Sequence, residues 1–591
     1  MFFLKFIRFF AVIVTAIFVN KTYAVLPVDP GANSPTNAGQ ILQEIERDQN
    51  KKPLQRQPQL DIKPKTVEPN NEQLLKIKHF NFEGNKIVGT EDLNKLTQEL
   101  LSRDVTLNEL KNVVNIITDY YRKKGYIAVV SLPEQDITEG EVKIKILESK
   151  IGKIKINGIY NKDFYRVNPN LIKSISEAYL NKHGYVNLDE INHGLTNAND
   201  LPGIRVTSSL KPGDSEGLTD VVLEVKDKPF YSISLSADNS GSRSIGRERY
   251  LVNADLLSPL HYGDDLNFIG LHTEGSDFGK FSYEIPIGSY GLRSNISYSR
   301  LEYKVILDGF ESNAIPQGNS DTRGINFSYP ILNSPQTHFK ISTDYTAKRF
   351  LNEIGQSVVS DYGINVKSLT LSGDHYDSFL FLGGTTNVSL VVSHGNVNLT
   401  NSPNQSYDSQ SFQAEGDYTK ARFSINRTQF IKDDLLFNVL FTGQLANKNL
   451  DSSEKFYLGG MSGVRAYPSN EAGGSEGFMF NLEIMKFLPH NFSVSGFADY
   501  GRIKQNINNY FHIPGIADEL QSKLTSGSLA DNLYAISGYG ASVGWQGPYK
   551  SNFKAIISRR MGENPNMNNA GLDQDGTKHI NNIWLTASIL F

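Results

Sequence analysis

The sequence contains no cysteine in its 591 residues. Disulfides and thiolate metal sites are therefore excluded, and noncovalent contacts must hold the fold together. Beyond the first 24 residues, no apolar run reaches the ~18 residues expected of a membrane-spanning helix. Tryptophan is also rare, with two residues, and only 21% of the chain is charged. The sequence therefore indicates neither helical membrane spans nor a highly charged surface.

The N-terminus is typical of a secretory signal peptide. Lys5 and Arg8 precede an apolar run of about eleven residues, and Ala24 supplies the small residue before a cleavage site. The run is shorter than the ~20 residues of a spanning helix. We predict a signal peptide over residues 1–24, whose removal leaves 56 basic and 63 acidic residues, a net charge of −7. This mild acidity argues against nucleic acid as a partner.

An exported chain without spanning helices is either soluble or a β-barrel, and the composition favours the barrel. The chain has 28 Tyr, 33 Phe and 49 Gly, and aromatic residues form the interfacial girdles of barrels. Segments that alternate apolar and polar residues recur after residue 228, most clearly at 231–237, and again at 292–299, 339–345 and 437–441. A soluble all-β adhesin shares this composition but would rarely place Arg and Asn opposite so many apolar faces.

Residues 228–591 are long enough for a barrel of about sixteen antiparallel strands, at ~10 residues per strand plus connections. The last segment, 583–591, is apolar at every odd position and ends in Phe591. We expect those positions to face lipid, with Thr586 and Ser588 towards a wet interior. Phe591 is accordingly predicted to be the barrel-assembly signal.

Residues 75–227 follow a different pattern, which repeats after about eighty residues. Thr106 and Glu109 form a capping box, and the helix that follows ends at Gly125. Asn187 followed by Glu190 is the matching helix start. The flanking strands also correspond, 77–82 with 154–158 and 141–146 with 219–225. The repeat predicts two α+β modules, over 75–150 and 151–227, each ordered strand, helix, helix, strand, strand.

Short motifs stand in both the second module and the predicted barrel. The second module contains Leu201-Pro202-Gly203, then Pro212-Gly213 and Gly217-Leu218-Thr219-Asp220. The glycine-rich stretch 458–477, here named the lumen loop, contains Val464-Arg465-Ala466-Tyr467-Pro468, and Phe497-Ala498-Asp499-Tyr500-Gly501 follows. With these motifs the chain resembles the two-partner secretion transporters of the TpsB family, the ShlB/FhaC/HecB-like haemolysin secretion proteins, in which two POTRA domains precede an outer-membrane barrel.

The resemblance implies that the lumen loop folds into the barrel and that Arg465 forms a salt bridge with Asp499. A poorly hydrated guanidinium needs such a partner. Strand alternation places Phe497, Asp499 and Gly501 on one face, where Gly501 leaves room for the loop. Alternatively, Arg465 and Asp499 are unrelated lumen charges. Ala466 stands where the family usually has Gly, and its methyl group restricts the backbone at the loop tip.

Residues 25–50 are predicted to form an N-terminal plug segment. Residues 37–50 have the narrow apolar stripe of a short helix, and prolines punctuate the linker 51–74. The resemblance implies that this helix sits in the pore as a removable plug. A disordered leader is the alternative, since isolated short helices are marginally stable.

Enzyme motifs are weak. Residues 473–477 fit G-x-S-x-G, but a nucleophile elbow requires a strand that runs into a helix, and this stretch lies in a long loop. The sequence has neither a P-loop nor an H-E-x-x-H pair. We therefore predict no catalytic residue, no metal and no cofactor.

Together these features predict an outer-membrane pore of a Gram-negative bacterium that exports a large unfolded exoprotein without ATP. Its POTRA domains, in the periplasm, would capture the N-terminal secretion domain of the cargo by strand pairing at a sheet edge. Other expected partners are outer-membrane lipid and lipopolysaccharide, the barrel-assembly machinery and periplasmic chaperones. An assembly factor that inserts other barrels is the alternative, and a passive porin or receptor is more distant. The cargo could be a cytolysin, an adhesin, a haem-scavenging protein or a contact-dependent toxin.

Overall fold

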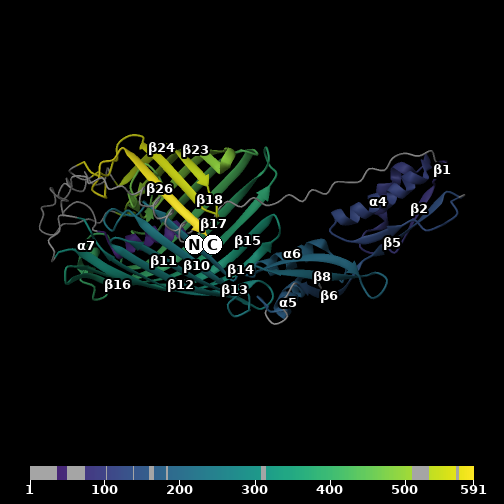
Figure 1. Ribbon diagram of the computed structural model, residues 1–591, viewed down its shortest axis with the longest axis horizontal. Coiled ribbons are helices and arrows are strands. Elements are labelled where there is room, and N and C mark those ends of the chain that lie inside the picture. The colour runs from purple at the N-terminus through teal and green to yellow at the C-terminus, as the bar shows by residue number, and fades with distance from the viewer. Residues whose placement is uncertain are drawn as a thin grey trace, which may run out of the picture.

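The computed structural model describes residues 36–49, 74–101, 103–137, 139–158, 165–180, 184–307, 314–508, 532–567 and 571–591. It contains a closed barrel, and two α+β modules extend in a row from one end of it (Figure 1). The predicted signal peptide and most of the predicted linker 51–74 lie outside the described residues. Among the described residues, no helix is long and apolar enough to cross a membrane.

The first module has a three-stranded sheet, β2-β5-β4, covered by two helices. Its elements are β1 (Leu74–Lys76), β2 (His79–Glu83), α3 (Thr90–Thr97), η1 (Gln98–Leu100), β3 (Asp104–Thr106), α4 (Leu107–Lys123), β4 (Ala128–Ser131) and β5 (Glu141–Glu148). The capping box is present at α4, where Thr106 and Glu109 each accept from the other's backbone N–H. The first strand of the sheet starts at His79, two residues later than expected.

The second module repeats this order with β6 (Lys150–Gly158), α5 (Pro169–Leu180), α6 (Leu188–Asn199), β7 (Ile204–Pro212) and β8 (Leu218–Asp227), in the sheet order β6-β8-β7. Asn187 caps α6 by accepting from the backbone N–H groups of Asp189 and Glu190. Asp220 of the last motif accepts from the Lys153 N–H (2.7 Å) at a register shift in β6. The predicted order of strand, helix, helix, strand, strand is confirmed in the second module. The first module has the same order with two short strands added, β1 and β3, which pair with each other, and the domain boundaries given above stay predictions.

The barrel closes with sixteen strands, as expected from its length. They are β9 (Tyr231–Asp238), β10 (Arg249–Leu257), β11 (Asp265–Thr273), β12 (Ser276–Ile287), β13 (Leu292–Lys304), β14 (Pro316–Asn333), β15 (Thr337–Ile354), β16 (Ser357–Asp377), β17 (Gly384–Asn398), β18 (Gly416–Lys432), β19 (Leu435–Ala446), β22 (Glu476–Phe487), β23 (Phe492–Lys504), β24 (Leu533–Gln546), β25 (Asn552–Arg560) and β26 (Asn581–Leu590). Antiparallel pairing of β26 with β9 closes the ring, and Phe591 extends it through backbone hydrogen bonds with Ile233. On β26, Ile583 is 58% exposed and Trp584 is buried inside.

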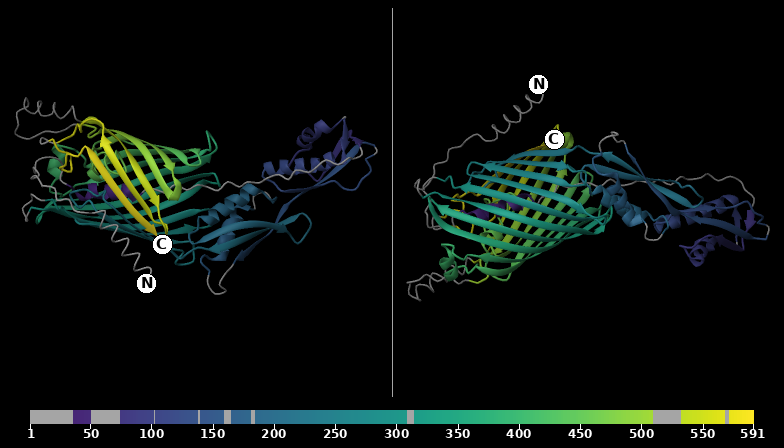
Figure 2. Two further views of the ribbon diagram at one scale, coloured as in Figure 1. Left: turned by 45° about the horizontal axis from the view of Figure 1, so that its top comes forward. Right: turned by 90° about the horizontal axis from the view of Figure 1, so that it is seen from below.

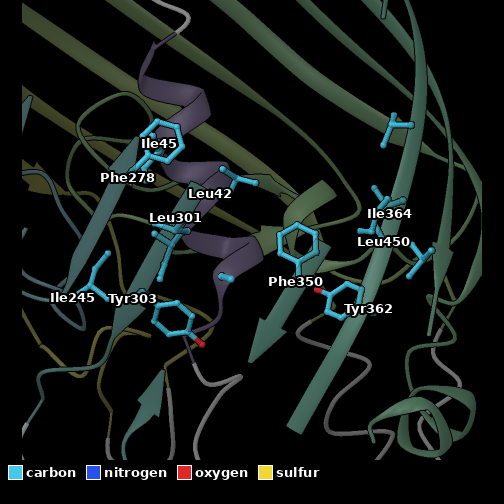
Figure 3. Close-up of a cluster of buried hydrophobic side chains, with 14 of the residues drawn as sticks. Leu42, Ile45, Ile245, Phe278, Leu301, Tyr303, Phe350, Tyr362, Ile364 and Leu450 are labelled. Carbon is cyan, nitrogen blue, oxygen red and sulfur yellow. The ribbon is translucent and has the colours of Figure 1, made fainter. Parts of the chain in front are cut away.

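The lumen is filled by two segments from distant parts of the chain. One is the helix α2 (Ala38–Gln49), which lies inside the barrel in each view (Figures 1 and 2). The other is the connection from β19 to β22, which carries η2 (Ser452–Glu454), β20 (Phe456–Tyr457) and β21 (Gly473–Gly474). Leu42 and Ile45 of α2 pack with Phe278 and Leu301 of the wall in one buried cluster (Figure 3). Part of the lumen is therefore an apolar core between α2 and the wall.

Candidate functional site

The lumen loop is held deep inside the barrel by its central motif. Val464, Ala466 and Tyr467 are completely buried, and Arg465 is 6% exposed. The Pro468 carbonyl accepts from the Glu471 N–H (3.3 Å), which tightens the turn after the motif. These side chains pack with barrel residues of β22, β23 and β24. The sequence-predicted motif thus lies against the wall formed by the last strands.

Arg465 and Asp499 are in direct contact. Asp499 accepts from the Nε (2.9 Å) and Nη2 (2.8 Å) of Arg465 and from its backbone N–H (3.0 Å). Glu483 accepts from Nη1 (2.9 Å), and the guanidinium lies 3.4 Å from the centre of the Phe497 ring. The charge is therefore paired with two carboxylates and stacked on an aromatic face, which satisfies a buried guanidinium.

Small residues make room for the loop, as the F-x-D-x-G pattern suggested. A Cβ on Gly501 would lie 2.7 Å from the side chain of Leu458, the first residue of the lumen loop. A Cβ on Gly538 of β24 would lie 2.4 Å from the Ala466 methyl. Ala466 is not among the described residues with positive φ, so its backbone does not need glycine. The wall, through Gly538, accommodates the extra methyl.

The strands and loop that follow also hold the motif. The Arg465 carbonyl accepts from Trp584 Nε1 and Ser558 Oγ, both at 2.7 Å. Arg560 lies over the Tyr467 ring (4.3 Å), donates to the Ala466 carbonyl (3.2 Å) and pairs with Asp573. The motif is thereby fixed by its backbone as well as by its side chains.

The start of the same connection is anchored to strands β15 and β18 by residues that the sequence analysis did not identify. Glu454 of η2 lies 2.5 Å from the Nζ of Lys420 on β18 and 3.2 Å from the Nζ of Lys348 on β15. Nearby, Asp451 accepts from the Tyr362 hydroxyl (3.0 Å). No local pattern marks these residues, since Glu454 pairs with residues 34 and 106 positions earlier in the chain, and sequence periodicity does not report such separations.

The helix α2 contacts both the wall and the lumen loop. Arg249 of β10 donates to Asp48 (2.8 Å), and Ala38 N–H donates to Asn352 of β15 (3.0 Å). On the loop side, Asn470 donates to Glu44 (2.6 Å), and Arg47 donates to the Gly459 carbonyl (3.0 Å). The helix therefore adds contacts between the wall and the lumen loop.

The motif Leu201-Pro202-Gly203 lies at the junction between the second module and the barrel. Ser258, in the turn after β10, donates to the Pro202 carbonyl (2.7 Å), and a Cβ on Gly263 would lie 2.5 Å from the Leu201 side chain. Pro212-Gly213 instead ends β7, where the Gly213 N–H donates to the Leu218 carbonyl (2.8 Å). The first motif docks the module, and the second shapes the β7–β8 turn.

The G-x-S-x-G match does not form a nucleophile elbow. Ser475 stands between β21 and β22, so a strand follows it where an elbow requires a helix. Its hydroxyl is buried, accepts from the Leu450 N–H (3.1 Å) and donates to the Gln505 carbonyl (3.2 Å). Ser475 joins the lumen loop to the wall.

A sixteen-stranded barrel with a loop and a helix in its lumen, and with two POTRA-like modules at one end, defines an outer-membrane transporter. The model of the haemolysin secretion/activation protein family ShlB/FhaC/HecB matches residues 217–520, more than half of the chain. The chain therefore belongs to this family, the transporters of two-partner secretion. The model of the ShlB-type POTRA domain matches residues 75–149.

Curated relatives and solved structures agree with this assignment. The chain is 28% identical over 464 residues to the heme/hemopexin transporter protein HuxB of Haemophilus influenzae, covering 77% of this chain and 80% of that protein. It is 24% identical to the hemolysin transporter protein HpmB of Proteus mirabilis, covering 81% and 86%. Its fold matches CdiB from Escherichia coli with a TM-score of 0.65 at 17% identity, over 96% and 100% of the two chains. The protein is thus an outer-membrane secretion pore whose POTRA domains lie in the periplasm.

Proposed function

We propose that the pore exports one large secreted protein and that α2 is a plug that leaves the lumen before export. The observation that carries this proposal is that α2 lies inside the closed barrel and contacts both the wall and the lumen loop. An unfolded chain needs the space that the helix fills. Its apolar stripe is short, so much of its attachment depends on ion pairs and hydrogen bonds, which water can replace.

A disulfide tether tests this proposal directly, because the chain has no cysteine of its own. A Cβ on Gly39 would lie 3.0 Å from the Ser453 Cβ, within a small adjustment of disulfide geometry. We expect the double variant Gly39→Cys/Ser453→Cys to block export when oxidised and to restore it on reduction. Each single cysteine variant serves as the control. Normal export by the oxidised, fully cross-linked protein would show that α2 does not leave.

We further propose that the edge strand β4 of the first module captures the cargo. Ser149 N–H donates to the Ile127 carbonyl (3.0 Å), so by antiparallel alternation Val129 bonds towards β5 while Ala128 and Val130 direct their backbone groups outward. In the second module the corresponding edge of β7 is partly closed, because Asn199 exchanges two hydrogen bonds of 2.8 Å with the backbone of Val206. The β4 edge is the more available of the two.

A cross-link at this edge tests the capture step. Val129 is 58% exposed, and Asn112 is exposed on α4, away from the edge. With a thiol-reactive cross-linker in the periplasm, Val129→Cys should trap the secreted partner, and Asn112→Cys should not. Equal trapping at both positions would contradict capture at β4.

The cargo proposed here is a large secreted exoprotein, since the relatives include proteins named as a heme/hemopexin transporter and as a hemolysin transporter. Export would need no catalytic step in this chain and would be driven by folding of the cargo outside the cell. Ser475→Ala tests the absence of catalysis. Because only two neutral hydrogen bonds are lost, it should lower export of the cargo in a heterologous outer membrane much less than Arg465→Ala does.

A further inference from the structure

The outer face of the barrel carries a group of cations around one small residue. On β15, Ala347 is flanked along the strand by Tyr345 and Arg349. Its neighbours across the sheet are Arg323 on β14 and Asn365 on β16. Lys367 of β16 lies opposite Tyr345, so it is diagonal to Ala347. We name these residues the β14–β16 seat: Arg323, Tyr345, Ala347, Arg349, Asn365 and Lys367.

The side chains of the seat point away from the lumen. Arg323, Tyr345, Arg349, Asn365 and Lys367 are all exposed, whereas their neighbours Thr322, Tyr362 and Val366 are buried. Neighbouring strands lie ~5 Å apart and alternate residues on one strand ~7 Å apart, so all five side chains can reach the space above Ala347. The side chain of Ala347 is small, so it leaves room for a ligand between the surrounding hydrogen-bond donors. We call this open space above Ala347 the floor of the seat.

The height of the seat on the barrel places it at the outer leaflet. Docking of the second module on the turn after β10 marks that rim as periplasmic. Arg323 and Ala347 are each about ten residues from the periplasmic ends of their strands, which is ~26 Å along the axis at a tilt near 40°. The apolar band of such a barrel is ~25 Å tall. Below the seat, Ile325 and Phe327 are exposed and apolar, as lipid contact requires.

The carboxylates near the seat have cationic partners outside Arg323 and Lys367, and Arg300 pairs with Glu302 (2.8 Å) as well as with Asp321. Asp321 is bound by Arg300 (3.1 Å) and by the Tyr298 hydroxyl (2.5 Å), and Asp361 is bound at two points by Arg349. Within the part of the chain that the structure describes, Arg323 and Lys367 form no ion pair. Neither of these two cations is therefore held by a carboxylate among the described residues, and both lie at the level of lipid headgroups.

One hydrogen bond orients the remaining donor of the seat. The Tyr345 hydroxyl donates to Oδ1 of Asn365 (3.2 Å). This bond occupies the acceptor end of the amide, so its two N–H groups are left to donate. The seat thus offers a fork-shaped guanidinium, an ammonium and an amide around an open floor, a combination suited to the oxygens of a phosphate.

We propose that the β14–β16 seat binds a phosphate group on the headgroup of a glycolipid in the outer leaflet. Arg323 and Lys367 supply the charge, Asn365 supplies neutral donors, and Tyr345 packs beside the first sugar. This role is separate from export. Lipid binding at one side of the barrel would set the depth and the rotation of the barrel in the membrane.

Native mass spectrometry of the full-length chain in detergent tests the proposal, with bis-phosphorylated lipid A as the probe and its dephosphorylated form as the comparison. We expect Arg323→Gln/Lys367→Gln to weaken retention of lipid A about tenfold, because two charge-assisted contacts are lost. Ala347→Phe, which fills the floor without changing charge, should have a similar effect. Arg502→Gln removes an exposed arginine from β23 outside the seat and is the matched control.

Three results would overturn the proposal. The first is equal retention of lipid A by the wild type and by both seat variants. The second is equal retention of the phosphorylated and dephosphorylated glycolipids by the wild type. The third is complete displacement of lipid A by millimolar inorganic phosphate, which would make the seat a site for free anions. Persistent binding in excess phosphate, lost only in the seat variants, supports the lipid headgroup.

Discussion

Removing the charge of Asp499 should release the lumen loop from the wall without unfolding the barrel. Asp499 accepts three hydrogen bonds from Arg465, two of them from the guanidinium. Each charge-assisted bond contributes about 1.5–3 kcal/mol, and breaking a buried pair costs about 3–5 kcal/mol. Glu483 keeps part of the guanidinium charge paired in Asp499→Asn. We therefore expect a loss of about 3 kcal/mol from the docked state, a factor of about 150.

Thiol labelling measures this loss. Val464 is completely buried next to Arg465, and a cysteine there becomes reactive only when the loop leaves the wall. In a Val464→Cys background, the labelling rate follows the undocked population as long as redocking is fast. Asp499→Asn and Arg465→Gln should each raise the rate about a hundredfold, and the double variant should raise it little further, because the two residues share one interaction.

Arg427→Gln is the matched control, since it breaks an ion pair with Asp377 that has no contact with the lumen loop. It should leave the rate unchanged. The reasoning is refuted if Asp499→Asn and Arg465→Gln label no faster than this control, or if the double variant shows the simple product of the two single effects.

Three further predictions concern other contacts. Gly538→Val should drive a side chain into Ala466 and undock the loop at a cost of about 1–3 kcal/mol, measured by the same labelling, whereas a labelling rate like that of the parent would show that the wall yields. Gly263→Val, at φ +68° and against the leucine of the Leu-Pro-Gly motif, should loosen the second module, seen as a broader distribution of spin-label distances to the barrel; an unchanged distribution would contradict a role in docking. The Thr106 N–H and a nearby arginine hold the pKa of Glu109 below its ordinary value, so this cap stabilises α4 above about pH 4.3 and is lost as pH falls through the folded pKa. Amide protection at the start of α4 should fall with pH, and a Glu109→Gln variant that showed the same fall would refute the assignment.

The sequence was sufficient for features that depend on neighbours along the chain. The α4 capping box follows from Thr106 and Glu109, three residues apart, and the inward side of β23 follows from alternation around Asp499. The contact between Arg465 and Asp499 could be predicted because each residue lies in a short motif that resembles a motif of the family. In these cases the period of the backbone determines which side chains share a face.

Other parts of the site could not be predicted because their partners are distant in sequence. Glu454 meets Lys348 and Lys420 only once the barrel has closed, and nothing near Glu454 marks it as an anchor. The fit of Ala466 depends on Gly538, seventy-two residues later, so the sequence suggested a restricted loop tip where the wall compensates. Such pairs form only when the barrel closes, and the periodicity of neighbouring residues does not predict them.

The two anchorages of the β19–β22 connection have a mechanical consequence. Glu454 fixes the start of the connection to β15 and β18, and Arg465 fixes its middle to β22 and β23. The connection therefore ties together the arc of wall from β15 to β23, and such a tie resists changes in the curvature of that arc. Freeing Arg465 would clear space and also let the barrel change from round to oval, so the pore could adapt its outline to the cargo while its hydrogen-bonded wall stays intact.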